Sequence, residues 1–230
     1  MSESEFKNGK VLLIDKPLEW TSFQVVNKVR WTIKKKFNLK KIKVGHAGTL
    51  DPLATGLLIL CTGKFTKKIS KYQAQEKEYI GKLTLGATTP SYDLETEINK
   101  NFPINHLTEN DIYKHTHKFI GEIDQKPPLF SAIKKDGKRL YDLARAGETT
   151  VMKARKVTIS EFEITEIAMP EVTFRTVCSK GTYIRSLAHD FGKALGSGAY
   201  LSELRRTRIG NFKVADAFTI DKFLSQLGNI

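Results

Sequence analysis

The side chains best placed to do chemistry lie in the segment GHAGTLDP, residues 45–52, where His46 and Asp51 stand close together. The proline after Asp51 favours extended backbone at the acid and marks the boundary between a loop and the apolar run that follows. Gly45 and Gly48 would let this loop turn sharply or approach a ligand closely. An Asp-Pro pair at such a point is commonly only a turn, but an aspartate at the edge of a core strand can also be a catalytic carboxylate.

A second candidate, Arg185, would keep such a carboxylate ionised. A nucleophilic carboxylate must stay charged in a pocket that excludes water, and a nearby guanidinium is the usual means. Arg185 ends a Tyr-x-Arg sequence, residues 183–185, at the predicted start of a helix. It could instead be a surface arginine, but the helix dipole slightly disfavours a cation at that end. This conflict suggests that Arg185 has an anionic partner, for which Asp51 is the candidate.

The charge of the chain predicts a polyanionic partner. Its 230 residues include 38 Lys and Arg against 25 Asp and Glu, a formal net charge of +13. The densest basic run, residues 34–44, is consistent with a phosphate contact or with a solvated helix end. Residues 121–148 mix basic and aromatic side chains in a way that suits an RNA strand. The residues concerned are Lys134, Lys135, Lys138, Arg139, Arg145, Phe130 and Tyr141. A surface charge that only aids solubility is the alternative.

Other kinds of site find no support in the sequence. Cys61 and Cys178 lie far apart in apolar runs, so we expect buried free thiols rather than a disulfide. His115 and His117 lack a second ligand pair at zinc-site spacing, so we expect surface residues and no metal site. Neither a signal peptide nor an apolar stretch of about 18 residues is present, so we expect a cytoplasmic protein with no membrane partner.

Strand patterns recur along the chain. They predict strands at residues 10–15, 57–62, 78–86, 156–168 and 171–181. The last two alternate apolar and polar residues on either side of a tight turn, and we expect them to form an antiparallel pair. Residues 135–137 signal a hairpin turn, and residues 87–106 are expected to form a long loop.

Helical patterns lie between these strands. After Thr21 and Ser22, apolar residues at spacings of three and four predict a helix with one buried face. These residues are Phe23, Val26, Val29, Ile33 and Phe37. Residues 182–196 predict another helix, with Thr182 as its N-cap and Gly196 at its end. Shorter helices are predicted at residues 64–72 and 219–228, so we expect an α+β fold without a regular βαβ repeat.

Five segments, in one order, resemble the blocks of the bacterial tRNA pseudouridine-55 synthase (TruB) family. They are LLIDKPLEWTS (12–22), GHAGTLDPLATGLL (45–58), KEYIGKLTLG (77–86), PPLFSAIKKDGKRLYDLARAG (127–147) and CSKGTYIRSLAHDFG (178–192). Two departures stand out. Glu19 occupies a position where the family usually has glycine, and residues 88–97 match the family's Thr/Asp-rich block only loosely.

The resemblance implies a pseudouridine-synthase-type α+β fold, with a mixed, mostly antiparallel central sheet flanked by helices and loops. It implies a single catalytic domain over residues 1–230, with a basic, RNA-gripping insertion at about residues 122–155. We expect this insertion to be mobile and poorly ordered without RNA. The family's C-terminal RNA-binding PUA domain is expected to be absent.

The resemblance also implies an activity, the isomerisation of uridine 55 in the T-loop of tRNA to pseudouridine. The N1–C1′ bond breaks, and the base turns and rejoins through C5, so no cofactor and no metal are expected. The target base must leave its stack, which requires a ring to receive it and cations to hold the strand. The expected partner is the T-arm stem-loop of tRNA, and we expect a monomer.

Site residues follow from the resemblance by position. Asp51 matches the catalytic aspartate, which would either attack C1′ or take a proton from C2′. Tyr79 matches the tyrosine that stacks on the base and can accept the C5 proton, and Arg185 matches the arginine that pairs with the aspartate. Positions that contact the flipped nucleotide or its neighbours, or that support the pocket floor, are matched by His46, Tyr183, Leu204 and Lys16.

Two other functions remain open from the residues alone. A nucleoside or glycoside hydrolase would also cleave a bond at C1′, but such enzymes usually need a second carboxylate flanking the bond, and none is evident beside Asp51. A non-catalytic RNA-binding protein would share the charge and the aromatic residues. Loss of turnover with retained RNA binding in Asp51→Asn would identify the enzyme.

Overall fold

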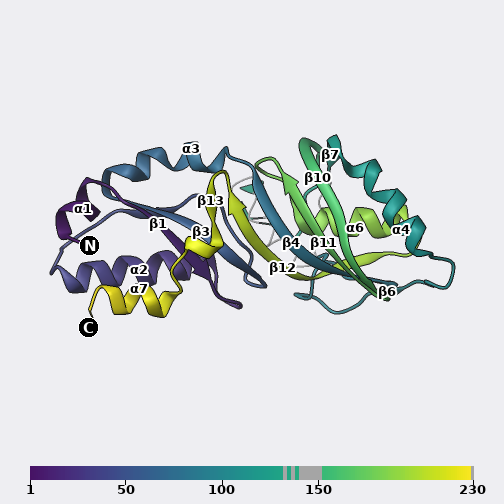
Figure 1. Cartoon of the computed structure of the whole chain (residues 1–230), viewed down its shortest axis with the longest axis horizontal. Coiled ribbons are helices and arrows are strands. Elements are labelled where there is room, and N and C mark those ends of the chain that lie inside the picture. The colour runs from purple at the N-terminus through teal and green to yellow at the C-terminus, as the bar shows by residue number, and fades with distance from the viewer. Residues whose placement is uncertain (132–133, 136–137, 140–151, 229–230) are drawn as a thin grey trace. The chain divides into compact units, whose positions relative to one another are not determined.

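The computed structural model describes residues 1–131, 134–135, 138–139 and 152–228 of the chain. By its internal contacts the chain divides into two compact units. Unit 1 comprises Met1–Tyr79 and Leu204–Ile230, and unit 2 comprises Ile80–Glu203. Two strands, β4 (Lys77–Leu85) and β12 (Ala199–Ile209), have residues in both units. Figure 1 labels the elements along the chain.

The sheet of unit 1 has the strand order β1-β3-β12-β4. β1 (Val11–Lys16) and β3 (Ala54–Thr62) run antiparallel, whereas β12 runs parallel to β3, with Leu204 opposite Ala54. Two short strands extend the edges: β2 (Val44–His46) pairs with β3, and β13 (Phe212–Lys213) pairs with β12. β3 is buried along almost its whole length, as expected of an apolar run between two other strands.

Helices cover both faces of this sheet. They are α1 (Glu3–Asn8), α2 (Ser22–Lys36), η1 (Gly63–Lys68), α3 (Ile69–Gln73), η3 (Val214–Asp216) and α7 (Ile220–Gln226). On one face, Val29 of α2 and Phe223 of α7 belong to the same core cluster as Leu58 of β3. On the other face, Ile69 of α3 packs against a cluster that contains Leu57 and Ile59. Figure 1 shows α2 and α7 on one side of the strands and α3 on the other.

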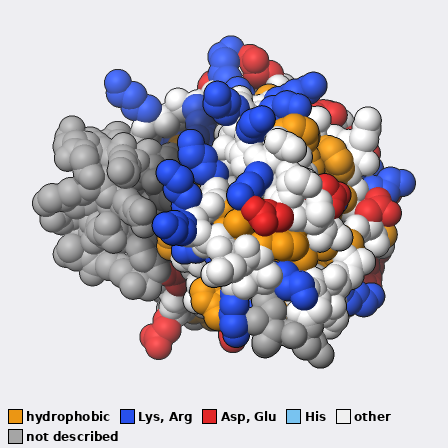
Figure 2. All heavy atoms as spheres, turned by 90° about the vertical axis from the view of Figure 1, so that its left-hand side faces the viewer, with side chains coloured by type: hydrophobic (Ala, Val, Ile, Leu, Met, Phe, Trp, Pro, Cys, Tyr) orange, Lys and Arg blue, Asp and Glu red, His pale blue; other side chains and the backbone are white. Residues whose placement is uncertain are grey.

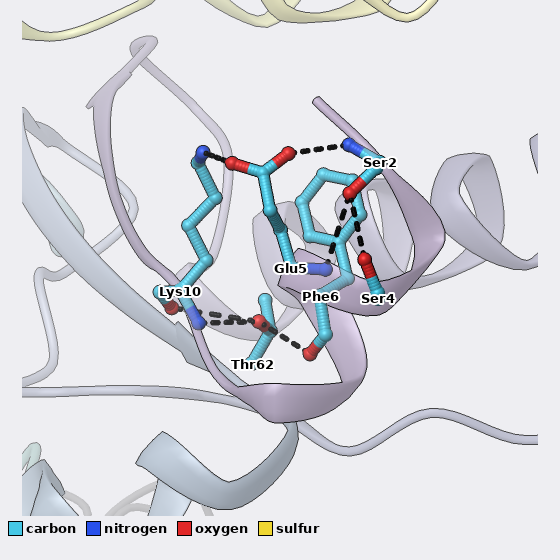
Figure 3. A network of polar contacts seen from close by, with 6 residues as sticks. All are labelled: Ser2, Ser4, Glu5, Phe6, Lys10 and Thr62. Carbon is cyan, nitrogen blue, oxygen red and sulfur yellow. Dashed lines mark hydrogen bonds and ion pairs between the residues drawn. The ribbon is translucent and has the colours of Figure 1, made fainter.

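The N-terminal helix α1 is fastened to the sheet by the polar network of Figure 3. A capping box joins Ser2 and Glu5 and satisfies free N–H groups of the first turn. Glu5 also pairs with Lys10 at 2.7 Å. Thr62, at the end of β3, donates its hydroxyl to the Phe6 carbonyl at 2.9 Å and accepts the Lys10 N–H at 3.0 Å. The start of the chain therefore braces the far end of β3.

Unit 2 is built on a sheet with the strand order β12-β4-β11-β10-β7. β10 (Arg155–Ala168) lies antiparallel to both β11 (Glu171–Cys178) and β7 (Gly121–Gln125). Two small antiparallel pairs stand apart: β5 (Ala87–Thr88) with β6 (Lys100–Asn101), and β8 (Lys134–Lys135) with β9 (Lys138–Arg139). The mixed, mostly antiparallel sheet confirms the predicted fold class.

The core of unit 2 forms where helices meet β10 and β11. The helices are α4 (Glu109–Thr116), η2 (His117–Phe119) and α6 (Ile184–Ala194). The ring of Phe162 on β10 makes edge-to-face contacts with Phe191 of α6 at 5.2 Å and with Phe174 of β11 at 5.6 Å. Such offset contacts add to the burial of the rings themselves.

Several predicted elements are confirmed. Residues 156–168 and 171–181 supply the antiparallel pair, and the hairpin flanks pair with Lys135 opposite Lys138. Cys61 and Cys178 are buried free thiols. Of the insertion at 122–155, residues 132–133, 136–137 and 140–151 lie outside the described residues. Tyr141 and Arg145 are among them, and the single domain and the mobile insertion stay predictions.

Other local predictions are wrong. Phe23 is 62% exposed, because the buried stripe of α2 lies on the side opposite to it. Thr182 is not the N-cap of α6, since its hydroxyl donates to the Ser179 carbonyl and Tyr183 takes the capping position without a side-chain bond. Gly45 lies in β2, so it does not form a turn, and its close approach to a ligand stays a prediction. Residues 87–106 are not entirely loop, because they contain β5 and β6.

Candidate active site

Asp51 lies in the loop of residues 47–53 between β2 and β3, which we name the aspartate loop. The residue is half-buried and stands three positions before Ala54, where β3 begins. The Ala54 N–H donates to the Asp51 carbonyl at 3.1 Å, so the loop ends in a tight turn. Gly48 has a φ of 118°, a conformation that favours glycine, as the sequence predicted for a turn here.

Lys16 is a buried cation that bonds the backbone of the aspartate loop. Its Nζ donates to the carbonyls of Pro17 at 2.8 Å, Trp20 at 2.6 Å and Pro52 at 3.3 Å. Burial lowers the pKa of Lys16 to about 8, although the charge of Asp51 acts in the opposite direction. Lys16 therefore fixes the backbone of the residue that follows Asp51 and places a positive charge close to the carboxylate.

Ser22, the first residue of α2, fixes the residue that precedes Asp51. The Ser22 hydroxyl donates to the Leu50 carbonyl at 3.0 Å and accepts the Leu50 N–H at 2.8 Å. The Glu19 N–H donates to the Pro52 carbonyl at 2.9 Å. Bonds on both sides of Asp51 therefore set its backbone in one position.

Arg206 is a positioning residue that the sequence reasoning missed. Its side chain is almost fully buried, and its guanidinium donates to the carbonyls of Leu57 at 2.7 Å, Gly48 at 3.1 Å and Thr49 at 3.3 Å. A buried cation bonded to three carbonyls joins β12, β3 and the aspartate loop. The run of arginines at 205, 206 and 208 was the available signal, because a strand that carries three cations cannot expose all of them on one face.

Gly56 lets β3 approach β12 beside Arg206. A Cβ at Gly56 would lie 2.3 Å from the Arg206 carbonyl oxygen, and the φ of Gly56 is 105°. No other residue type fits this backbone without displacing a strand. The close approach keeps the Arg206 side chain under the aspartate loop.

Three other predicted residues of unit 1 lie on neighbouring strands. Leu204 is half-buried on β12, opposite Ala54. Tyr79 is 8% exposed on β4, the strand on the other side of β12. His46 is half-buried on β2, and burial, together with the charge of Arg206, lowers its pKa, so its imidazole is neutral near pH 7.

Tyr183 and Arg185 belong to unit 2, at the start of α6. The backbone of Tyr183 is held by Gln125, whose amide accepts the Tyr183 N–H at 2.8 Å and donates to its carbonyl at 3.0 Å. The guanidinium of Arg155 lies over the Tyr183 ring at 4.7 Å, a distance suited to a cation–π contact. One face of this tyrosine is therefore already paired with a cation.

Arg185 is buried and has an anionic partner within its own unit. Its Nη1 lies 3.5 Å from Asp93 Oδ2 and donates to the Ser91 carbonyl at 3.1 Å, and its Nη2 donates to the Phe130 carbonyl at 2.8 Å. The surface alternative for Arg185 is wrong. A buried ion pair of this kind needs further hydrogen bonds to offset desolvation, and both carbonyls supply them.

Asp93 is the second residue that the sequence reasoning missed. Its carbonyl accepts the hydroxyls of Thr89 at 2.6 Å and Ser91 at 3.1 Å, and its carboxylate accepts the Glu95 N–H at 3.0 Å. The hydroxyl and acidic residues gathered in 88–97 were the signal. Buried hydroxyls beside a buried acid are typical of a loop that orients the acid.

Within unit 1, Lys16 and Arg206 bond the backbone of the aspartate loop, and Leu204 lies opposite Ala54, the first residue after it. No three His, Cys, Asp or Glu side chains gather to hold a metal ion in the described part of the chain. Among the described residues, none of the helices is long and apolar enough to span a membrane.

Comparison with known proteins gives two matching family models. One, described as "TruB family pseudouridylate synthase (N terminal domain)", matches residues 34–184. The other, "tRNA pseudouridylate synthase B C-terminal domain", matches residues 185–228. Among solved structures, a chain of a Cbf5–Nop10–Gar1 complex is 34% identical, with a TM-score of 0.72 over 99% of this chain. A chain of an H/ACA ribonucleoprotein bound to a substrate RNA containing 2′-deoxyuridine is 31% identical, with a TM-score of 0.68. This chain spans 58% of each.

Curated relatives match along nearly the whole chain. The tRNA pseudouridine synthase B of Flavobacterium johnsoniae is 62% identical over 228 residues, which is 99% of this chain and 100% of that protein. The enzyme of the same name from Phocaeicola vulgatus is 56% identical over 95% of this chain and 93% of its own length. The chain belongs to the TruB family of tRNA pseudouridine synthases, which are intramolecular isomerases.

Proposed function

We propose that the chain isomerises uridine 55 in the T-loop of tRNA, with Asp51 as the reacting carboxylate and with the target base flipped out of its stack. The observation that carries this proposal is the fixation of the aspartate loop. Ser22, Lys16 and Arg206 bond its backbone on both sides of Asp51. A carboxylate that must reach one atom of a sugar gains rate from being held in position before the substrate arrives.

The proposed reaction needs one carboxylate held at the sugar of the target nucleotide. The N1–C1′ bond breaks, the detached base turns, and a C5–C1′ bond forms while the C5 proton leaves and N1 gains one. Asp51 would assist either by attack on C1′ or by removal of the C2′ proton. The product nucleoside is an isomer of the substrate nucleoside. No electrons and no group are gained or lost, so the proposed reaction uses no cofactor.

The flipped base needs a ring and hydrogen-bond donors around it. We assign stacking and acceptance of the C5 proton to Tyr79, which is mostly buried on β4. His46, Leu204, Lys16 and Tyr183 would contact the flipped nucleotide or support the pocket. Arg185 would pair with Asp51, with its own orientation set by Asp93.

The T-arm stem-loop is the proposed recognition element, bound by a monomer. Structural relatives support an RNA partner, since one of them holds a substrate RNA. Location in the cytoplasm stays a prediction. Family membership disfavours the two other functions that the residues left open, a hydrolase and a non-catalytic RNA-binding protein.

The deciding experiment measures tritium release from a T-arm stem-loop labelled at C5 of uridine, with wild type compared with Asp51→Asn. We expect Asp51→Asn to bind the stem-loop while turnover falls by several orders of magnitude, because a nucleophile or base is removed. Free uracil without pseudouridine would indicate a hydrolase. Unchanged turnover in Asp51→Asn would rule out the proposed mechanism.

A further inference from the structure

The outward face of helix α2 carries aromatic, amide and lysine side chains and no acid. We name it the α2 face; it consists of Trp20, just before the helix, and Phe23, Gln24, Asn27, Lys28, Trp31 and Lys35. Its members recur at helical spacing and lie opposite the stripe that α2 buries. Trp20, Gln24, Asn27, Lys28 and Trp31 line a groove of about 410 Å³.

Two large rings of the α2 face are left in water. Trp31 is 53% exposed and Phe23 is 62% exposed, on a helix whose other side packs well. Exposed apolar side chains that cluster beside polar ones commonly mark a binding surface. Nothing in the core of unit 1 requires an aromatic ring at either position.

Two ammonium groups lie over the Trp31 ring, at distances suited to cation–π contacts. Lys35 Nζ lies 5.1 Å and Lys28 Nζ 5.7 Å from the ring centroid. A base that stacks on this indole would displace an ammonium group from the ring face, and the freed lysine could then bind the phosphate of that nucleotide. Gln24 and Asn27 add amide groups that can bond the edge of a base.

The surroundings of the α2 face are strongly positive. Between residues 20 and 50 there is no acid, although the exposed Glu19 precedes Trp20. The cations of the same segment are Lys28, Arg30, Lys34, Lys35, Lys36, Lys40, Lys41 and Lys43. Figure 2, which views the molecule from the left-hand side of Figure 1, shows many lysine and arginine side chains on that side of the molecule, with hydrophobic patches and fewer acidic side chains among them. A field of this sign attracts phosphates.

The α2 face also begins beside the aspartate loop. Ser22, the first residue of α2, bonds Leu50, and the carbonyl of Trp20 accepts the Lys16 ammonium that holds Pro52. From there the 15-residue helix extends for about 22 Å and ends at the basic run of residues 34–44. An RNA with one nucleotide at Asp51 therefore has a continuous surface of cations and rings to follow within unit 1.

We propose that the α2 face is a second RNA-binding surface, where an unpaired base of the tRNA stacks on Trp31 and neighbouring phosphates bind Lys28 and Lys35. It rests on the proposed tRNA substrate and adds a contact away from the target uridine. A protein partner fits less well, because lysine is depleted at the centre of protein interfaces, whereas lysines here surround the exposed ring.

Fluorescence of the full chain tests stacking directly. Trp20 and Trp31 are the only tryptophans of the sequence, and Trp20 lies beside the aspartate loop, so the measurement uses Trp20→Phe, in which the emission comes from Trp31 alone. An unmodified tRNA transcript should quench the emission with the same saturation curve as its binding measured by filter retention. Heparin, a polyanion without bases, should compete for binding but leave the emission unquenched.

Substitutions test the energetics. Trp31→Ala should bind the transcript at least about fivefold more weakly, the low end for loss of one stacked base. Lys28→Gln with Lys35→Gln should lower the slope of log affinity against log salt by about 1.5. The matched control is the double variant Tyr113→Ala and Lys114→Gln on α4, where an exposed aromatic residue stands beside a lysine. Its affinity for the transcript and the salt dependence of that affinity should equal those of wild type.

The proposal is overturned if tRNA binds without quenching, or if Trp31→Ala binds as tightly as the α4 control. Both results, binding without quenching and unchanged binding by Trp31→Ala, are expected if the α2 face binds a protein segment instead of RNA. Failure of tritium release from the T-arm stem-loop would instead count against the proposed function and would leave the quenching result standing. The two proposals therefore fail separately.

Discussion

Ser22 and Leu50 form a reciprocal pair through a single hydroxyl, which donates to the Leu50 carbonyl at 3.0 Å and accepts the Leu50 N–H at 2.8 Å. Both residues are buried, with 2% and 3% of their surface exposed. No water can replace either bond at such a position without opening the loop. The first residue of α2 thereby sets the backbone directly before Asp51.

Removal of this hydroxyl should therefore weaken both stability and turnover. Ser22→Ala leaves the buried N–H and C=O of Leu50 without their partner, at a cost of about 1 to 3 kcal/mol in the free energy of unfolding. We also expect the turnover rate at saturating tRNA to fall at least about tenfold, because the proposed carboxylate loses its fixed position. Urea unfolding and tritium release measure the two effects. Ser225→Ala, on the exposed side of α7, is the control, and equal turnover in the two variants would contradict the prediction.

The strands and helices of the chain were largely predictable because their residues alternate or recur over local distances. The antiparallel pair of β10 and β11 follows from period-two alternation on either side of one turn. Phe23 was misplaced because spacing alone cannot tell whether an apolar residue at the start of a helix belongs to the buried stripe or to the exposed side. The capping position of α6 was misplaced by one residue, since Thr182 bonds Ser179 instead.

The sequence yields candidate site residues only where residue types signal chemistry by themselves. Asp51, Tyr79 and Arg185 came from recognisable segments, and their roles stay predictions. Arg206 and Asp93 did not, because their roles depend on carbonyls and side chains far away in sequence. Arg206 bonds Leu57 across 149 positions, a partnership that no local pattern encodes. Buried polar networks of this kind require the fold before they can be seen.

Glu19 has a left-handed backbone conformation, which favours glycine, the residue that the resemblance implies is usual in the family at this position. Its φ is 64°, in the left-handed region, and its side chain is exposed. Glu19→Gly should raise the free energy of unfolding by up to about 1 kcal/mol, because relief of left-handed strain exceeds the entropy that glycine adds to the unfolded chain. Urea unfolding measures the change. Glu19→Ala keeps a Cβ in the same conformation and should show no gain; an equal gain would point to the side-chain charge instead.

Cys61 should make the stability of the protein fall at alkaline pH. Burial raises the pKa of its thiol from 9.0 to about 11. Between these values the unfolded thiol has lost its proton and the folded one has kept it, so the unfolded state binds fewer protons and stability decreases as the pH rises. The full contribution is present below about pH 9, and about 2 to 3 kcal/mol is lost by about pH 11.

The variant Cys61→Ala isolates this effect. It should be less stable than wild type near neutral pH, because a cavity replaces the sulfur. The difference between the two proteins should shrink between about pH 9 and pH 11, since only wild type carries the titrating thiol. Urea unfolding of both proteins at several pH values measures it. A difference that stays constant with pH would show that the thiol titrates alike in both states.

Arg206 should affect the turnover rate because it bonds the backbone of the aspartate loop, although it is not proposed to contact the substrate. Arg206→Met keeps most of the buried volume but leaves the carbonyls of Gly48, Thr49 and Leu57 without their donor, so we expect a loss of about 3 kcal/mol in the free energy of unfolding. Arg206→Lys keeps the charge but cannot reach three carbonyls at once. Its free energy of unfolding should therefore lie between those of Arg206→Met and wild type. At a temperature where each variant is folded, kcat should fall in the same order while KM for tRNA changes little, because the loop is displaced and the binding surface is not. Equal kcat in wild type and in folded Arg206→Met would show that this arginine only stabilises the strands and does not position Asp51.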